Sequence, residues 1–241
     1  MESPNGPADV ATFGFSTTTN VSISANTEVN GITFTSAATN PYNITASPGL
    51  TLTISGTGIT NNSGRAQSFE ADNDASGNIG TIVFSNSATA GGSNVSIFSE
   101  GGSIKFFNRS TAGSAVIDNF FSSRGEGGPM NFFDHSTAGN STIIEEGNGT
   151  NFFNWSTAGS ARIQMFFGSV SFNDHSSAGS ASFGVPDDSR VSFSNSSTAG
   201  NAFFAASGEI GFLDSSTAGS AVIDTAGYLF FRIFPRWHSA D

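Results

Sequence analysis

The sequence predicts an all-β protein, a single-stranded, right-handed parallel β-helix (β-solenoid) with about 20 residues in each rung. Three observations support this fold. A tetrapeptide close to Ser-Thr-Ala-Gly occurs seven times at a nearly constant spacing. Apolar residues recur at every second position on both sides of each copy, which is the period of a β-strand. Gly, Ser, Thr and Asn fill the remaining positions and favour turns over helix.

The last Gly of each tetrapeptide marks one repeat. These glycines are Gly91, Gly113, Gly139, Gly159, Gly179, Gly200 and Gly219. Seven positions before each of them stands a Phe: Phe84, Phe106, Phe132, Phe152, Phe172, Phe193 and Phe212. Units of this length cannot bury an apolar face alone, so they stack. Equivalent residues then lie about 4.8 Å apart, and parallel β connections are right-handed.

The chain divides into four segments of one domain. Residues 1–9 contain two Pro and a Gly and are expected to form a flexible N-terminal lead. Residues 10–80 carry strand patterns without the tetrapeptide and are interpreted as divergent N-terminal rungs or a cap. Residues 81–227 hold the regular repeats. Residues 228–241 are rich in large apolar side chains and are predicted to be a C-terminal cap or a docking segment.

The longer spacing between Gly113 and Gly139 predicts an insertion within residues 120–130 that bulges from the stack. It adjoins Phe107, Phe133 and Phe153, which stand one position after a ladder Phe and should therefore point outward. Three outward rings on consecutive rungs would form an aromatic strip. Two alternatives stay open: the strip is a contact surface, or the insertion folds over it.

The net charge of −11 disfavours nucleic acid and anionic membranes as partners, because both attract basic surfaces. The absence of Cys excludes disulfides and thiolate metal sites. No run of 18 apolar residues occurs, so membrane insertion is not expected. The first residues do not resemble a signal peptide, so the extracellular location predicted below assumes an export signal outside this sequence.

An Asn or Asp stands five positions before each repeat Gly. These residues are Asn86, Asn108, Asp134, Asn154, Asp174, Asn195 and Asp214. Each stands two positions after a ladder Phe, so strand alternation predicts that it points toward the core, at a corner of the rung. There the Asn amides should donate hydrogen bonds to the neighbouring carboxylates. A structural ladder is favoured over a cation site, since Ca²⁺ needs six to eight oxygens around one point.

No catalytic, cofactor-binding or metal-binding residues are predicted, and no cofactor. His135 and His175 are two rungs apart, too far for a shared Zn²⁺, and are expected to be solvated. Asp187, Asp188 and Arg190 form the only compact candidate for carbohydrate chemistry, but the sequence around them is typical of a turn. A cleft lined by two or more carboxylates would favour an enzyme, and a smooth polar face would favour a structural role.

Self-association is predicted from apolar residues near both ends of the chain and on the aromatic strip. The candidate residues are Val10, Phe13, Phe15, Phe107, Phe133, Phe153, Phe230, Phe231, Phe234 and Trp237. End rungs of a β-helix carry unpaired backbone groups that can pair with another chain. The C-terminal residues are either a lid over the last rung or a docking surface for the next copy, and head-to-tail contacts would give open fibres.

Residues 106–118 and 151–163 resemble the β-strand repeats of autotransporter-type bacterial surface proteins. Residues 29–34 and 50–59 are similar to the repeat that opens such passengers. The resemblance implies an exported β-helix, displayed on a cell surface or released, in a family of adhesins, spacers and some enzymes. The predicted function is an extracellular structural or adhesive solenoid whose partners are itself, surface glycans or host and matrix molecules. The alternative is a carbohydrate-binding or polysaccharide-degrading β-helix.

Overall fold

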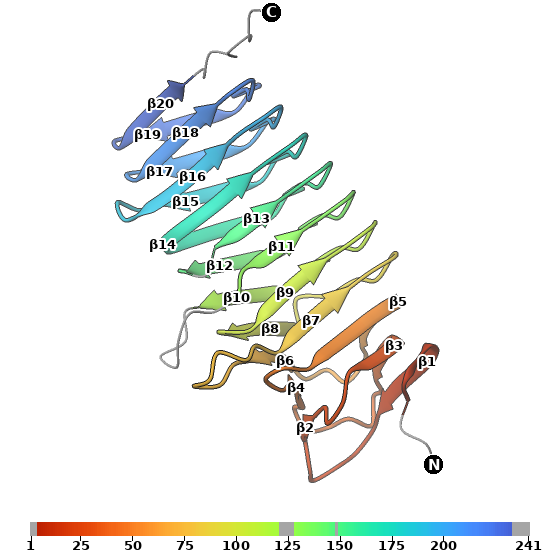
Figure 1. Cartoon of the computed structure of the whole chain (residues 1–241). Helices are drawn as coiled ribbons and strands as arrows, with labels where there is room; N and C mark the ends of the chain where they lie inside the picture. The colour runs from red at the N-terminus through yellow and green to blue at the C-terminus, as the bar shows by residue number, and fades with distance from the viewer. Residues whose placement is uncertain (1–3, 121–127, 148, 233–241) are drawn as a thin grey trace, which may run out of the picture.

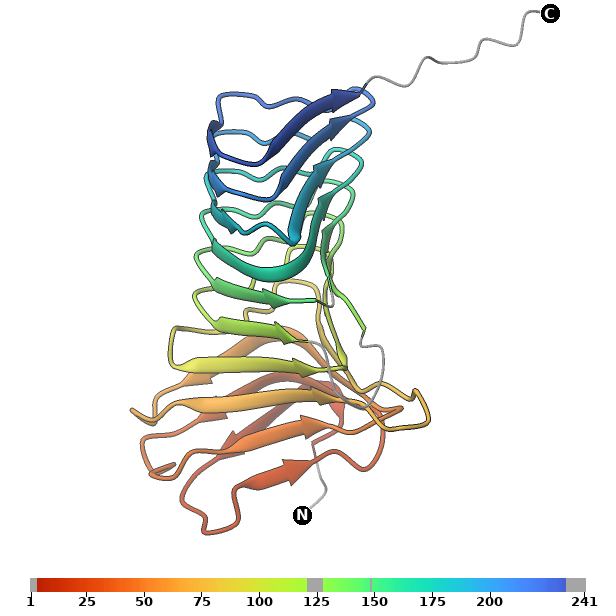
Figure 2. The same cartoon turned by 90° about the vertical axis from the view of Figure 1, so that its left-hand side faces the viewer.

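The structure is a computed structural model, and it describes residues 4–120, 128–147 and 149–232. Figure 1 shows parallel strands stacked along one axis, and Figure 2 shows the chain coiling around that axis from rung to rung. The solenoid has about 10 turns with about 21 residues per rung, which confirms the predicted all-β parallel fold. The right hand of the coil stays a prediction. The described residues contain no helix of the length and apolar character needed to cross a bilayer.

The strands form two parallel sheets that run the length of the stack. The first sheet contains β1 (Gly6–Phe13), β3 (Thr27–Phe34), β5 (Thr51–Asn61), β7 (Thr81–Phe84), β9 (Ser103–Phe106), β11 (Met130–Phe132), β13 (Thr150–Phe152), β16 (Ser189–Phe193), β18 (Glu209–Leu213) and β20 (Tyr228–Arg232). The second contains β2 (Asn20–Ser22), β4 (Asn43–Ala46), β6 (Gln67–Asp72), β8 (Val95–Glu100), β10 (Val116–Phe120), β12 (Thr142–Glu146), β15 (Ser182–Val185), β17 (Phe203–Ala206) and β19 (Val222–Thr225). The long strand β14 (Arg162–Phe172) bends from the second sheet into the first.

The predicted Phe ladder forms the centre of the core. Phe132 pairs with Phe152 in register, and their ring centroids lie 4.7 Å apart with nearly parallel planes. Every ladder Phe from Phe84 to Phe212 is buried. Inward residues of the second sheet, such as Ile143 and Ile163, close the core from the other side.

The tetrapeptides form the third side of each rung, where single parallel bridges join equivalent residues such as Thr137 and Thr157. In Ser156-Thr157-Ala158-Gly159 the Ser and Ala are fully buried. The Thr157 Oγ1 accepts a hydrogen bond of 3.0 Å from the Gly159 N–H, which holds the turn. Gly159 has a φ of 62°, a left-handed conformation that favours glycine. Each residue of the motif therefore has a distinct structural role.

The segment boundaries differ from the prediction at the N-terminus. β1 begins at Gly6 and pairs with β3, so residues 6–9 belong to the stack and the predicted boundary of the lead at residue 9 was wrong. Pro7 lacks an N–H group, but within the described part of the chain β1 pairs only with β3, so no strand on its outer side requires that group. Residues 10–80 form rungs, and in Figure 2 they are wider than the C-terminal ones.

The C-terminal segment continues the stack as β20, which pairs with β18. Its first five residues are therefore a further strand and not a lid folded over the last rung. The predictions for Phe234 and Trp237 fall outside the described residues, as does the predicted bulge over residues 121–127.

Candidate functional site

The Asn and Asp ladder lies at the surface and not toward the core, which corrects the prediction. All seven residues have φ between 56° and 58°. Along a regular strand, a residue two positions after an inward Phe also points inward. A residue in the left-handed conformation breaks this alternation, so the Asn or Asp side chain points outward instead. Asn and Asp tolerate this conformation better than other non-glycine residues. The chain therefore uses the same residue types at the same corner in every repeat.

Each ladder side chain bonds the backbone of the preceding rung. The Asn108 N–H donates to Asp134 Oδ2 at 2.8 Å, and the Asp134 N–H donates to Asn154 Oδ1 at 3.0 Å. The same pattern runs from Asn86 to Asp214. The Asn154 Nδ2 also donates to Asp174 Oδ2 at 3.3 Å, as predicted for an amide between two carboxylates. These side chains are therefore used to connect rungs.

The predicted outward strip is present. The rings of Phe107, Phe133 and Phe153 stack with centroids 4.8 and 5.1 Å apart, and all three side chains are half-buried. Beside them Trp155, 59% exposed, stacks on His175 at 4.3 Å. Both predicted His residues are exposed, as expected. Because the stacked rings cover one another's faces, this corner presents mainly ring edges, which favours a structural role over face-on ligand stacking.

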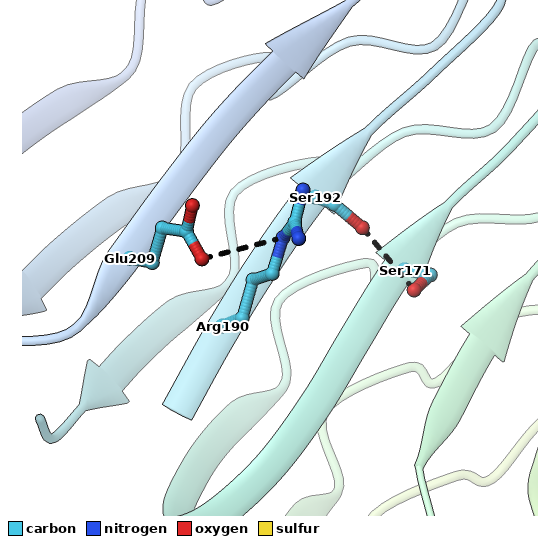
Figure 3. Close-up of polar contacts among 4 residues, drawn as sticks. All are labelled: Ser171, Arg190, Ser192 and Glu209. Atoms are coloured by element: carbon cyan, nitrogen blue, oxygen red, sulfur yellow. Dashed lines mark hydrogen bonds and ion pairs between the residues drawn. The ribbon is translucent and has the colours of Figure 1, made fainter. Parts of the chain in front are cut away.

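The hollow at Asp187 and Asp188 meets the criterion that would favour an enzyme. Asp187, Asp188 and Glu209 line a depression of about 580 Å³ together with Arg190 and Tyr228. In Figure 3, Arg190 on β16 reaches toward Glu209 on β18, and the Arg190 Nε lies 3.6 Å from the Glu209 Oε2. Ser192, on the same strand as Arg190, donates a hydrogen bond from its hydroxyl to the Ser171 hydroxyl on β14.

The two aspartates occupy the turn between β15 and β16, as the sequence indicated, and the Ser189 N–H donates to the Pro186 carbonyl at 3.0 Å. Both side chains are exposed. The exposed ion pair of Arg190 and Glu209 contributes little stability. The two aspartates are therefore solvent-exposed carboxyls in an open depression, and not a buried pair.

A buried carboxylate was missed by the sequence analysis. Glu145 on β12 is fully buried. Its Oε1 accepts hydrogen bonds from the Gly147 and Gly149 N–H groups at 3.1 and 2.8 Å, and its Oε2 accepts from Thr150 Oγ1 at 2.6 Å and Asn119 Nδ2 at 2.8 Å. This carboxylate ties the turn after β12 to β10 and β13.

Burial raises the pKa of Glu145 above its ordinary value of 4.5, although the four hydrogen bonds act in the opposite direction. A carboxyl whose pKa is higher in the folded state than in the unfolded state stabilises the fold at pH values below its unfolded-state pKa. This contribution is lost as the pH rises through its folded-state pKa. We therefore expect the stability advantage of the native chain over Glu145→Gln to shrink as the pH rises above 4.5. Urea unfolding at a series of pH values measures this difference, and Asp188→Asn, at an exposed carboxyl, is the control. An advantage that grows with pH would contradict the assignment.

A second group that the sequence did not reveal is Glu70, Asp72 and Glu100, whose carboxyl oxygens lie within 4.8 Å of one another on β6 and β8. Glu70 Oε2 accepts a hydrogen bond of 2.9 Å from Asn43 Nδ2. The register of the two strands brings these residues together at the surface. Acidic groups often lie close together without an ion, so the cluster is not assigned as a metal site.

Both ends of the stack expose apolar residues. At the N-terminal end Ala11, Phe13, Val21 and Ile23 border a hollow of about 250 Å³, and Phe13 stacks on Phe34 at 5.2 Å. Val10 and Phe15 are exposed, and Phe15 is 69% accessible.

At the C-terminal end Phe231, 63% exposed, stacks on Phe212 at 4.9 Å and continues the core ladder to the last described rung. Phe230 points outward, and its ring packs over Gly211 and beneath the Arg190 guanidinium. Phe231 is thus the predicted docking residue best placed for a second copy.

Comparison of the chain with family models, curated proteins and solved structures found no match. The likeness to autotransporter-type passengers therefore rests on the repeats alone. The structure shows that the chain is a repetitive β-solenoid.

Proposed function

We propose that this protein is an extracellular structural or adhesive β-solenoid, located outside the cell or on its surface, that assembles head-to-tail into fibres. The observation that carries the proposal is that both ends of the stack, as far as it is described, have free strand edges next to apolar core residues. Solenoids that remain monomeric usually cover their ends with a polar cap.

The two ends offer different but compatible surfaces. β20 and β19 are the last strands of the two sheets at one end, and β1 and β2 are the first at the other. All pairings within the sheets are parallel, so β1 of a second copy can add to β20 with the same strand direction. Such a contact joins two different surfaces and leaves each copy with one free end, which gives an open filament.

The charge of the chain opposes other modes of association. A net charge of −11 on each copy repels side-by-side packing at low ionic strength. Apolar contacts between ends are much less affected by salt. This supports growth along the axis, with lateral contacts appearing only when salt screens the charge. The same acidity supports the absence of nucleic acid and membrane partners.

A lysine at the C-terminal end should weaken the assembly. Phe231→Lys removes the exposed ring that extends the core ladder and places a charge in the contact. Burying a Phe side chain contributes about 1.5–3 kcal/mol, so we expect association to weaken roughly 10- to 100-fold. Light scattering across a concentration series measures it, and electron micrographs show whether the particles are linear.

The matched control is Phe166→Lys, which alters an exposed Phe on the side of the rod in β14. It should assemble like the native chain. A native chain that stays monomeric at high concentration would refute the assembly, and an equal loss in both variants would point to lateral contacts.

The hollow at Asp187 and Asp188 favours one alternative, a carbohydrate-binding or polysaccharide-degrading β-helix. We propose that the chain is not an enzyme, because both carboxyls are exposed in a turn. The polysaccharide-degrading form of this alternative predicts cleavage of a polysaccharide that is lost in Asp187→Ala or Asp188→Ala.

A further inference from the structure

Two outward columns of the second sheet have a gap in them near the C-terminal end. Arg162, Ser182 and Phe203 are paired in register on β14, β15 and β17. Gln164, Gly184 and Ala205 form the neighbouring column two positions further along the same strands. The residues between the two columns are buried, so both columns face solvent.

The middle rung of these columns lacks a large side chain. Ser182 is small, and a Cβ placed on Gly184 would have nothing within 4 Å. The result is a hollow of about 250 Å³ lined by Arg162, Gln164, Phe203 and Ala205 with β15 as its floor. Arg162 and Phe203 are two rungs apart, roughly 9–10 Å. A hollow of this volume has room for one six-membered ring.

The walls of the hollow have complementary chemistry. Phe203 is 45% exposed and offers an apolar ring on one side. Arg162 on the other side is exposed, and among the described residues it has no carboxylate partner, whereas Arg190 is paired with Glu209. Gln164 adds an amide and Ser182 a hydroxyl. A guanidinium binds a carboxylate through two parallel hydrogen bonds.

We propose that this hollow binds an acidic sugar, a pyranose ring that carries a carboxylate. The apolar face of the ring packs against Phe203, and the carboxylate binds Arg162. The ring hydroxyls bond Gln164 and Ser182. The amide and hydroxyl favour a sugar over an aromatic acid, which has the same ring and carboxylate but no hydroxyls to satisfy them. One sugar in a shallow site binds with a roughly millimolar Kd.

The experiment is a titration of the full-length ¹⁵N-labelled chain with D-glucuronate, followed by the amide signals of Ser182 and Ala205. We expect both signals to shift with saturation. D-glucose, which lacks the carboxylate, and benzoate, which lacks the hydroxyls, should bind at least tenfold more weakly. Benzoate binding as tightly as glucuronate would overturn the sugar assignment, and glucose binding equally well would overturn the role of Arg162.

Two variants locate the site without disturbing the core. Arg162→Gln should weaken glucuronate binding at least tenfold, and Gly184→Val should abolish it by filling the hollow from a strand position with room for a side chain. Arg190→Gln is the matched control and should bind like the native chain. The absence of saturable shifts in the native chain, or a loss of binding in Arg190→Gln but not in Arg162→Gln, would refute the proposal.

Discussion

Replacing Phe152 with Ala should lower the free energy of unfolding by roughly 3–5 kcal/mol, the cost of truncating a buried Phe. Phe152 is fully buried and lies between Phe132 and Phe172, with ring centroids 4.7 and 4.6 Å away. Truncation removes both stacking contacts and leaves a cavity that neighbouring rungs cannot fill, because their spacing is fixed by the strand hydrogen bonds. Urea unfolding followed by far-UV circular dichroism measures the loss.

The adjacent residue supplies the control. Phe153 is half-buried and has a ring neighbour on one side, Phe133, at 5.1 Å. Phe153→Ala should cost about 1 kcal/mol, mainly the stacking contact. Equal losses for the two variants would show that the assignment of inward and outward faces is incorrect.

The second large effect is expected at the corner glycines. Gly159→Ala places a Cβ 2.7 Å from the Gly139 carbonyl oxygen and 3.0 Å from Thr137 Oγ1, in a residue with a φ of 62°. The left-handed conformation alone costs about 1–2 kcal/mol for a non-glycine residue. The contact with the backbone of the preceding rung adds to this cost, because it can be relieved only by separating two rungs. We expect a loss of roughly 3–4 kcal/mol in the same unfolding assay.

Gly184→Ala provides the comparison within the same repeats. Its new Cβ meets nothing within 4 Å. Ala is about 0.5–1 kcal/mol better than Gly inside a strand, so this variant should be as stable as the native chain or slightly more stable. A similar loss of stability in Gly159→Ala and Gly184→Ala would mean that replacing any Gly of the repeats is costly, and that the close contact between rungs at Gly159 is not the cause.

Much of the architecture could be predicted because the same side chain recurs at a fixed distance from each repeat Gly. This offset alone predicts that Phe132 lies next to Phe152, and the two residues pair in register. The direction of the Asn and Asp ladder could not be obtained from alternation, since one left-handed residue reverses it. The residue types carried the missing signal, because Asn and Asp are the non-glycine residues that most readily adopt that conformation.

The remaining features depend on contacts between rungs. Glu145 stands at an inward strand position like Ile143, and the donors that satisfy its carboxylate come from three different segments, which the sequence around it does not reveal. The hollow beside Arg162 requires small residues on the rung above it. Arg162, Ser182 and Phe203 each stand three positions after a repeat Gly, so an alignment of the repeats at that offset would have revealed the gap.

The alternation of Asn and Asp along the ladder has a consequence for how such a chain can change in length. From Asn108 to Asp214 the two residue types take turns, and each bonds the backbone of the rung before it. Gain of an Asp repeat or loss of an Asn repeat between two Asp repeats places two carboxylates on adjacent rungs, where their repulsion is about 1–3 kcal/mol. Gain or loss of two repeats keeps every carboxylate next to an amide. A change of two repeats is therefore always compatible with the ladder, whereas a change of one repeat is compatible only when it adds an Asn repeat or removes an Asp repeat.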